Sequence, residues 1–198
     1  MSNSPRRKRR HIAYSVIAGV LIAVSAGCAD SDDDGADAAG TPPAPAATSA
    51  APAGAGIDAL NRAGETATGA VPDSTLISIE TERDGRWEVQ VVTPDGTEHE
   101  MDISGDGATV TMGPTSKNED EDDKTKHRDR IQAARLDYRA AADAVLTEVP
   151  NGTITELNID GNNGTTVWEA DVIDSSQTKR EVTVDAGSGE ILHNTAGR

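Results

Sequence analysis

The stretch TVWEADV, residues 166–172, carries one of the two tryptophans in this 198-residue chain. The other tryptophan lies in GRWEVQV, residues 85–91, and is also followed by glutamate and by alternating small or branched residues. Alternation of apolar and polar residues is typical of half-buried strands in an antiparallel sheet. The two stretches therefore predict that one strand of the fold is built twice.

The similarity continues beyond Trp87 and Trp168, which are 81 positions apart. Upstream, Val71-Pro72 matches Val149-Pro150 at an offset of 78, so one loop of the second copy is three residues longer. A register kept by several apolar positions indicates an internal repeat. The downstream positions that keep the offset of 81 are Glu100, Met101, Ile103 and Val110, which correspond to Glu181, Val182, Val184 and Ile191.

Each copy is predicted to have one helix followed by a meander of strands. The first helix, at about residues 57–67, is the weaker one, because Gly64 and Gly69 each cost about 1 kcal/mol relative to alanine. The fold class expected is α+β, with two tandem small domains or one fused pair, each having one helix on a three- to four-stranded antiparallel sheet. The second helix is predicted from residues on one face at helical spacing, namely Ile131, Ala134, Tyr138, Ala141, Ala142 and Val145.

The strands of each meander are predicted between turn signals. Arg83-Asp84-Gly85 and Asn162-Asn163-Gly164 have hairpin chemistry, because Asp-Gly and Asn-Gly tolerate positive φ. The predicted strands lie near residues 76–81, 87–91, 98–103 and 109–112 in the first copy, and near 154–159, 166–172, 179–184 and 190–192 in the second.

The N-terminus resembles a bacterial lipoprotein signal with its lipobox. Basic residues at positions 6–10 precede an apolar run at 12–24, and small residues then lead to Cys28, the only cysteine of the chain. The resemblance implies a signal peptide at residues 1–27, cleavage before Cys28 and fatty-acid chains on its sulfur. The alternatives are an uncleaved anchor helix, or an ordinary signal peptide followed by a chance cysteine.

Composition divides the remaining chain. Residues 28–56 are rich in Asp, Ala and Pro and predict a disordered tether. The predicted domains are residues 57–113 and 128–198, joined by a charged linker at 114–127. Without residues 1–27 the chain has 13 basic and 34 acidic residues, a net charge of −21. Such a charge excludes binding to nucleic acid and adsorption to anionic lipid, so lipid on Cys28 would have to provide membrane attachment.

The closing stretch TVDAGSGEILHN, residues 183–194, resembles the last strands of the PepSY domain. Asp185, Gly189, Glu190 and Ile191 carry the match. The first copy, with ISGDGATVTM, is a degenerate version that has Ser104 where the second has Asp185. The resemblance implies a domain that binds or restrains exported peptidases. It brings no catalytic residues and no cofactor.

Candidate site residues are few. Trp87 and Trp168 are interpreted as core anchors rather than as exposed peptide-binding aromatics. The segment 160–164, followed by Asp171, has a partial calcium-loop pattern, but a hairpin turn explains it better. No metal site is predicted. The histidines His11, His99, His127 and His193 occur singly, and the acidic run at 118–123 is interpreted as a solvated linker.

The function expected is that of a non-enzymatic, lipid-anchored protein on the outer face of the cytoplasmic membrane, which binds an exported peptidase or another envelope protein. Richness in Ala, Gly and Asp suits a high-GC Gram-positive bacterium. The alternative is an acidic envelope protein that binds calcium through its carboxylates. An enzyme is not expected, because the sequence has no P-loop, dinucleotide fingerprint or nucleophile elbow.

Overall fold

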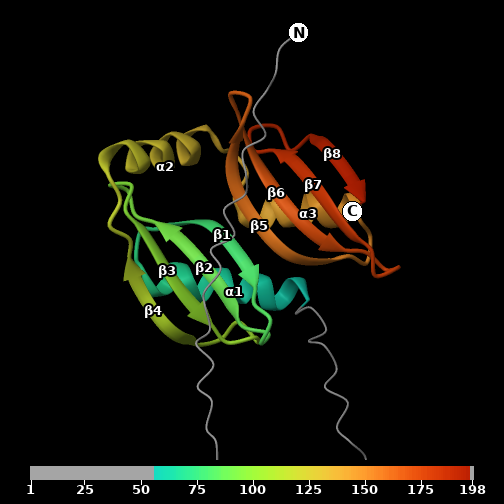
Figure 1. Cartoon of the computed structure of the whole chain (residues 1–198), viewed down its shortest axis with the longest axis horizontal. Coiled ribbons are helices and arrows are strands. Elements are labelled where there is room, and N and C mark those ends of the chain that lie inside the picture. The colour runs from blue at the N-terminus through green and yellow to red at the C-terminus, as the bar shows by residue number, and fades with distance from the viewer. Residues whose placement is uncertain (1–55, 197–198) are drawn as a thin grey trace, which may run out of the picture. The chain divides into compact units, whose positions relative to one another are not determined.

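The computed structural model describes residues 56–196, so Cys28, the predicted signal peptide and nearly all of the predicted tether lie outside the described residues (Figure 1). None of the described helices is long and apolar enough to cross a membrane. The elements, in chain order, are α1 (Ile57–Ala70), β1 (Thr75–Thr81), β2 (Trp87–Val92), β3 (Glu98–Ile103), β4 (Val110–Ser116), α2 (Glu121–Ala133), α3 (Tyr138–Glu148), β5 (Thr153–Asn162), β6 (Thr165–Ile173), β7 (Lys179–Asp185) and β8 (Ile191–Ala196).

The eight strands of residues 56–196 form one antiparallel sheet, in the order β4-β3-β2-β1-β5-β6-β7-β8. The three- to four-stranded sheets predicted for two tandem domains are thus joined edge to edge in a single sheet. The junction is the pairing of β1 with β5, in which Ile79 is opposite Leu157 and Ser78 is opposite Asn158. This pairing satisfies the backbone groups of two strands that would otherwise be sheet edges. The fold is α+β, with three helices and one eight-stranded sheet among the described residues.

The bounds of the elements keep the two offsets read from the sequence. Both copies even share a bulge in their first strand, between Leu76 and Ser78 and between Ile154 and Glu156. The same element order is therefore built twice within one sheet. Strands β3 and β7 begin 81 residues apart, at Glu98 and Lys179, and so do β4 and β8, at Val110 and Ile191. Strands β1 and β5 begin 78 residues apart, at Thr75 and Thr153.

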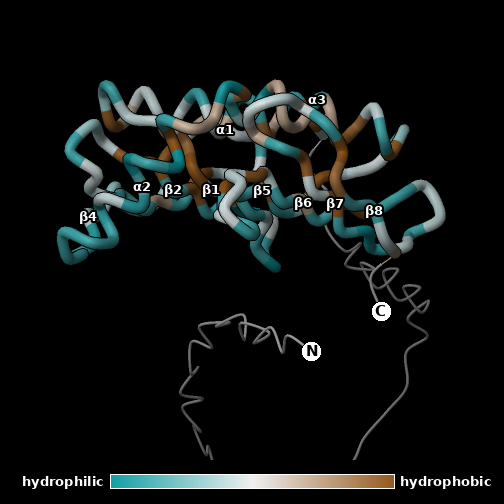
Figure 2. The backbone as a smooth tube through the Cα atoms, turned by 90° about the horizontal axis from the view of Figure 1, so that it is seen from above, coloured by the Kyte–Doolittle hydropathy of each residue, from teal (hydrophilic) through white to brown (hydrophobic). Residues whose placement is uncertain are grey.

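Helices α1 and α3 pack on the same face of the sheet (Figure 2). Trp87 is fully buried and Trp168 is 2% exposed, both in the core between this face and the helices. Each indole N–H has an acceptor, since Trp87 donates to the Gly105 carbonyl (3.3 Å) and Trp168 donates to the Leu136 carbonyl (3.1 Å). Burial with a satisfied N–H is what a large aromatic core residue requires.

The two helices also contact each other. The Tyr138 hydroxyl of α3 donates to the Asn61 carbonyl of α1 (3.1 Å), and Arg139 forms an ion pair with Glu65. Gly64 leaves room for the Tyr138 ring, because a Cβ at this glycine would lie 2.5 Å from the ring carbon Cζ. The halves of the molecule are therefore joined through the helix layer as well as through the sheet.

The segment predicted as a charged linker is largely ordered. It contains the end of β4 and most of α2, which the sequence analysis did not predict. The Asp120 carboxylate caps the N-terminus of α2 by accepting hydrogen bonds from the N–H groups of Asp122 and Asp123. Acidic residues in the first turn also stabilise α2, because they interact favourably with the positive end of the helix dipole.

The prediction of a single helix from residue 131 to residue 145 is wrong, because the helix is interrupted between α2 and α3. Ile131 belongs to α2. The backbone N–H groups of Arg135 and Leu136 both donate to the Ala186 carbonyl, which holds the break against the β7–β8 turn. The Asp137 carboxylate then caps α3 by accepting from the Ala140 N–H (2.9 Å).

Candidate functional site

The sheet face opposite α1 and α3, called the open face below, is lined by the polar positions of the alternating strands. Directly paired positions across six strands all carry carboxylates. Cα atoms of directly opposite residues in antiparallel strands are only about 4.5–5.5 Å apart. This set, called the carboxylate row, consists of Asp102 on β3, Glu88 on β2, Glu80 on β1, Glu156 on β5, Asp171 on β6 and Glu181 on β7.

Cations offset part of this charge toward the two ends of the row. Arg86 forms ion pairs with Asp102 and with Asp84. At the other end, Lys179 Nζ lies 2.6 Å from the buried carboxylate of Asp171, a contact that raises the pKa of Lys179. Like charges in directly opposite positions destabilise a sheet, so the two basic residues stabilise the arrangement locally.

Glu88 reports the electrostatics of the row most directly. Burial raises its pKa to about 7, with further contributions from the negative charges of Glu100, Glu82 and Glu80 and a small opposing effect of Lys117. At neutral pH this carboxyl group is therefore divided between its protonated and ionised forms. A cationic group placed on the open face would favour the ionised form, so proton release should accompany binding.

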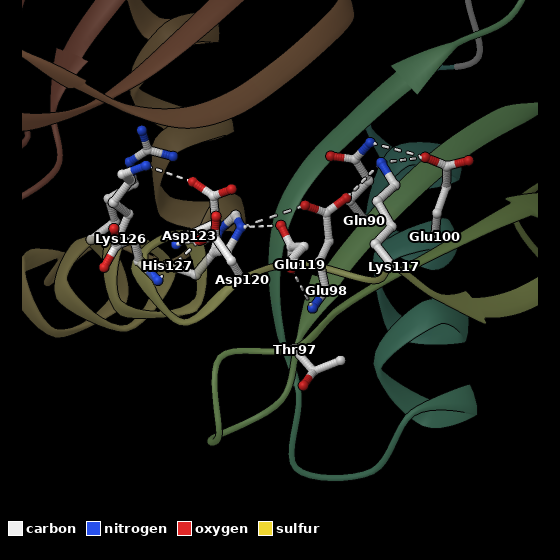
Figure 3. A network of polar contacts seen from close by, with 12 residues as sticks. Gln90, Thr97, Glu98, Glu100, Lys117, Glu119, Asp120, Asp123, Lys126 and His127 are labelled. Atoms are coloured by element: carbon white, nitrogen blue, oxygen red, sulfur yellow. Dashed lines mark hydrogen bonds and ion pairs between the residues drawn. The ribbon is translucent and has the colours of Figure 1, made fainter.

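A second polar group, called the His127 cluster, lies where α2 meets the start of β3 (Figure 3). His127 is 9% exposed, and its Nε2 lies 2.9 Å from Glu119 Oε1 and 3.5 Å from Glu98 Oε2. Glu119 Oε2 also accepts from the Glu98 backbone N–H (3.2 Å). Lys117 Nζ lies 2.7 Å from both Glu98 Oε1 and Glu100 Oε2. These contacts attach α2 to the sheet.

Sequence reasoning did not find either group. His127 and Glu119 were assigned to a solvated linker, and only the helical fold of α2 brings them to Glu98. The carboxylate row is invisible without the strand register, because its members come from six strands. The alternation of acidic and apolar residues was the one available signal, and it identifies the face but not the alignment.

The calcium-like pattern does not assemble. Strand register places Asp171 opposite Glu156, well along β6 from the turn that contains Asn163 and Gly164. Asp160 is opposite Val167 and forms an ion pair with Arg130 of α2 (2.6 Å). Asn163 and Gly164 have φ values of 50° and 85°, as the predicted hairpin turn requires. His99 directly follows Glu98 on β3, where successive side chains point to opposite faces of the sheet, and His193 lies on β8.

The ends of the strand order expose two edges, β4 and β8. Each carries a large exposed apolar side chain, Met112 at 65% and Leu192 at 48%. Pro114 in β4 has no N–H to offer an added strand, so β8 is the better edge for pairing with an extended peptide.

A comparison with known protein families finds a match within the second half of the chain. Residues 136–193 match the PepSY family model, described as the peptidase propeptide and YPEB domain. A PepSY domain is thereby found in this chain. The PepSY match contains α3, β5, β6, β7 and the start of β8, and it begins after α2.

The other comparisons add little. A crystal structure described as a "putative lipoprotein" from Clostridium difficile 630 resembles the chain with 18% sequence identity and a TM-score of 0.44, over 67% of this chain and 89% of that one. At that TM-score the likeness supports no conclusion. No curated protein matches the chain.

Proposed function

We propose that this chain is a lipid-anchored, extracytoplasmic, non-enzymatic binding protein whose PepSY domain holds or restrains an exported peptidase or another envelope protein. The observation that carries the proposal is the match of residues 136–193 to the PepSY family model, whose description names peptidase propeptides. Residues 57–113 are, in this proposal, a degenerate PepSY-like copy, since their elements follow the same order at matching offsets.

The open face and the β8 edge are the proposed contact surfaces. The carboxylate row supports a partner with a basic surface, because complementary charge speeds encounter and favours the correct partner. The exposed β8 edge supports an extended segment of the partner adding to the sheet. Both surfaces include strands of the matched domain.

A pull-down from envelope extract tests the proposal with two charge-matched variants. Glu80→Gln/Glu88→Gln lowers the charge of the open face, whereas Asp58→Asn/Asp143→Asn removes two charges from the helix layer. We expect the wild-type chain and the helix variant to retain a peptidase or another basic envelope protein, and the open-face variant to retain less. Recovery that is equal for all three, or that does not weaken as salt rises, would contradict binding through the carboxylate row.

Membrane anchoring is tested separately through Cys28, which lies outside the described residues. Cys28→Ser removes the only thiol of the chain, so metabolic labelling with a fatty acid should be lost. Labelling that persists in this variant would overturn the lipoprotein part of the proposal without affecting the binding part.

The second candidate function, calcium binding by an acidic envelope protein, is favoured only by the carboxylate row. Calcium needs six to eight oxygen ligands at about 2.3–2.6 Å gathered around one point, and residues spread along a row across six strands do not gather in that way. Calorimetric titration with calcium decides between the two. A saturable site of micromolar affinity or better would favour this second function.

A further inference from the structure

We infer that the His127 cluster is a binding site for a divalent transition metal ion, with zinc the best fit, through Glu98, Glu119 and His127. This inference is independent of the proposed partner binding. It concerns the junction of α2 and β3, away from the β8 edge.

The spacing of the three ligand atoms is close to that of a zinc site. His127 Nε2 is 2.9 Å from Glu119 Oε1 and 3.5 Å from Glu98 Oε2, and one ligand atom from each residue lies within 4.8 Å of the other two. Bonds of about 2.0–2.2 Å in a tetrahedral zinc site place ligand atoms about 3.3–3.6 Å apart. Side-chain movements of an ångström or so would therefore bring all three onto one ion.

The charge of the cluster suits a divalent cation. Glu98, Glu100 and Glu119 contribute three negative charges around Lys117, which supplies one positive charge. With His127 neutral, as a metal ligand must be, two negative charges remain. A proton on Nε2 can satisfy Glu119 at 2.9 Å but not Glu98 at 3.5 Å at the same time. A divalent ion would serve both carboxylates and cancel the charge.

Burial, and contacts made by the ligand residues with other groups, hold the ligand side chains in position. Glu98 is 6% exposed and His127 is 9% exposed, so the charges interact in a medium that screens them weakly. Lys117 holds the other oxygen of Glu98, and the Glu98 N–H holds the other oxygen of Glu119. Such outer contacts orient ligands in metal sites.

The ligand set selects the kind of metal. Imidazole nitrogen is a ligand of zinc and related transition metals, whereas calcium and magnesium take oxygen ligands. Three protein ligands leave a fourth position for water or for a group from a partner. The ion would join β3 to α2 and so tie the connection between the two halves to the sheet.

Calorimetric titration of the purified full-length chain tests the site. The titration uses the Cys28→Ser variant, so that the thiol cannot bind the metal. Metal already bound to the protein is first removed with a chelator. Zinc chloride should bind with one ion per chain, about tenfold or more tighter than calcium chloride, and should raise the melting temperature. His127→Gln and Glu119→Gln should each weaken zinc binding about tenfold or more.

The other histidines supply matched controls. His11→Gln, His99→Gln and His193→Gln should leave zinc affinity unchanged. Zinc binding that is equally tight in His127→Gln, or calcium binding as tight as zinc, would overturn the inference. Cobalt(II) added to the chain without ligand substitutions gives a readout that does not depend on how a variant folds. The visible absorption of four-coordinate cobalt supports the site, and its absence at saturation overturns it.

Discussion

At the scale of single residues, Glu88 shows how the strand register changes the chemistry of a side chain. An isolated glutamate would ionise near pH 4.5, but here burial and the neighbouring carboxylates raise the pKa to about 7. Glu88 lies between Glu80 and Asp102 in the carboxylate row. The nearby cations form ion pairs with other acids, Arg86 with Asp102 and Lys117 with Glu100. The folded state therefore favours the neutral form of Glu88.

This raised pKa predicts a loss of stability with rising pH. The folded chain holds the Glu88 proton more tightly than the unfolded chain, so its contribution is fully present below about pH 4.5 and is lost as pH rises through about 7. Glu88→Gln should remove this dependence and raise the free energy of unfolding by roughly 1 kcal/mol at pH 8, after allowance for solvent screening.

Urea unfolding at pH 4 and pH 8 measures the effect. Asp143→Asn, an exposed change on α3, should show no comparable gain at pH 8. A Glu88→Gln chain that is no more stable than wild type at pH 8 would show that the row does not strain the folded state.

The tryptophans make a second prediction at the residue scale. Trp168→Ala removes a ring that is 2% exposed and leaves the Leu136 carbonyl without its donor. The free energy of unfolding should fall by roughly 3–5 kcal/mol, measured by denaturant unfolding followed by circular dichroism. Leu192→Ala, at a side chain that is 48% exposed, should change it by less than about 1 kcal/mol. Similar small effects for both substitutions would contradict a core role for Trp168.

At the scale of elements, the strands were predictable and α2 was not. The strands follow from period-2 alternation and turn residues, both of which are local. Helix α2 has no apolar stripe, and it depends on the Asp120 cap and on contacts such as the ion pairs of Lys126 with Asp123 and of Arg130 with Asp160. The sequence of neither strand predicts that β1 pairs with β5. Because this pairing and α2 were not predicted, the carboxylate row and the His127 cluster could not be predicted from the sequence.

Two glycines of α1 separate packing from helix propensity. Gly64→Ala adds a methyl group that would lie 2.5 Å from the Tyr138 ring, so it should destabilise the chain by roughly 1–3 kcal/mol despite the better helix propensity of alanine. Gly69→Ala, in the same helix with nothing within 4 Å of the added Cβ, should be neutral or stabilise by up to about 1 kcal/mol. Thermal unfolding compares the two. Equal effects would contradict the close contact between α1 and α3.

At the scale of the whole molecule, the two copies share a sheet and a helix layer, so we expect them to unfold together. Trp87→Phe and Trp168→Phe leave one fluorescent reporter in each half. If the halves are one cooperative unit, then within each variant the melting curve from fluorescence should coincide with that from circular dichroism. A separate calorimetric transition for each half would instead indicate two independent domains joined by β1 and β5.

The pairing of β1 with β5 also has a symmetry. Ile79 and Leu157 are equivalent positions of the two copies and lie opposite each other, so a pseudo-twofold axis passes through the sheet between them. Such self-complementary contact is what a twofold homodimer has, here within one chain. The axis maps the carboxylate row onto a neighbouring row that is mostly uncharged, consisting of Glu100, Gln90, Ser78, Asn158, Glu169 and Thr183.

The two rows therefore differ in charge although the pseudo-twofold axis of the backbone relates one to the other. A backbone with twofold symmetry would present the same surface to a ligand in either of two orientations, half a turn apart. With six carboxylates in one row and two in its symmetry mate, a basic segment is favoured along the first row over the half-turn-related position along the second. The paired halves thus share one backbone arrangement, and the side chains of one row make their two surfaces different.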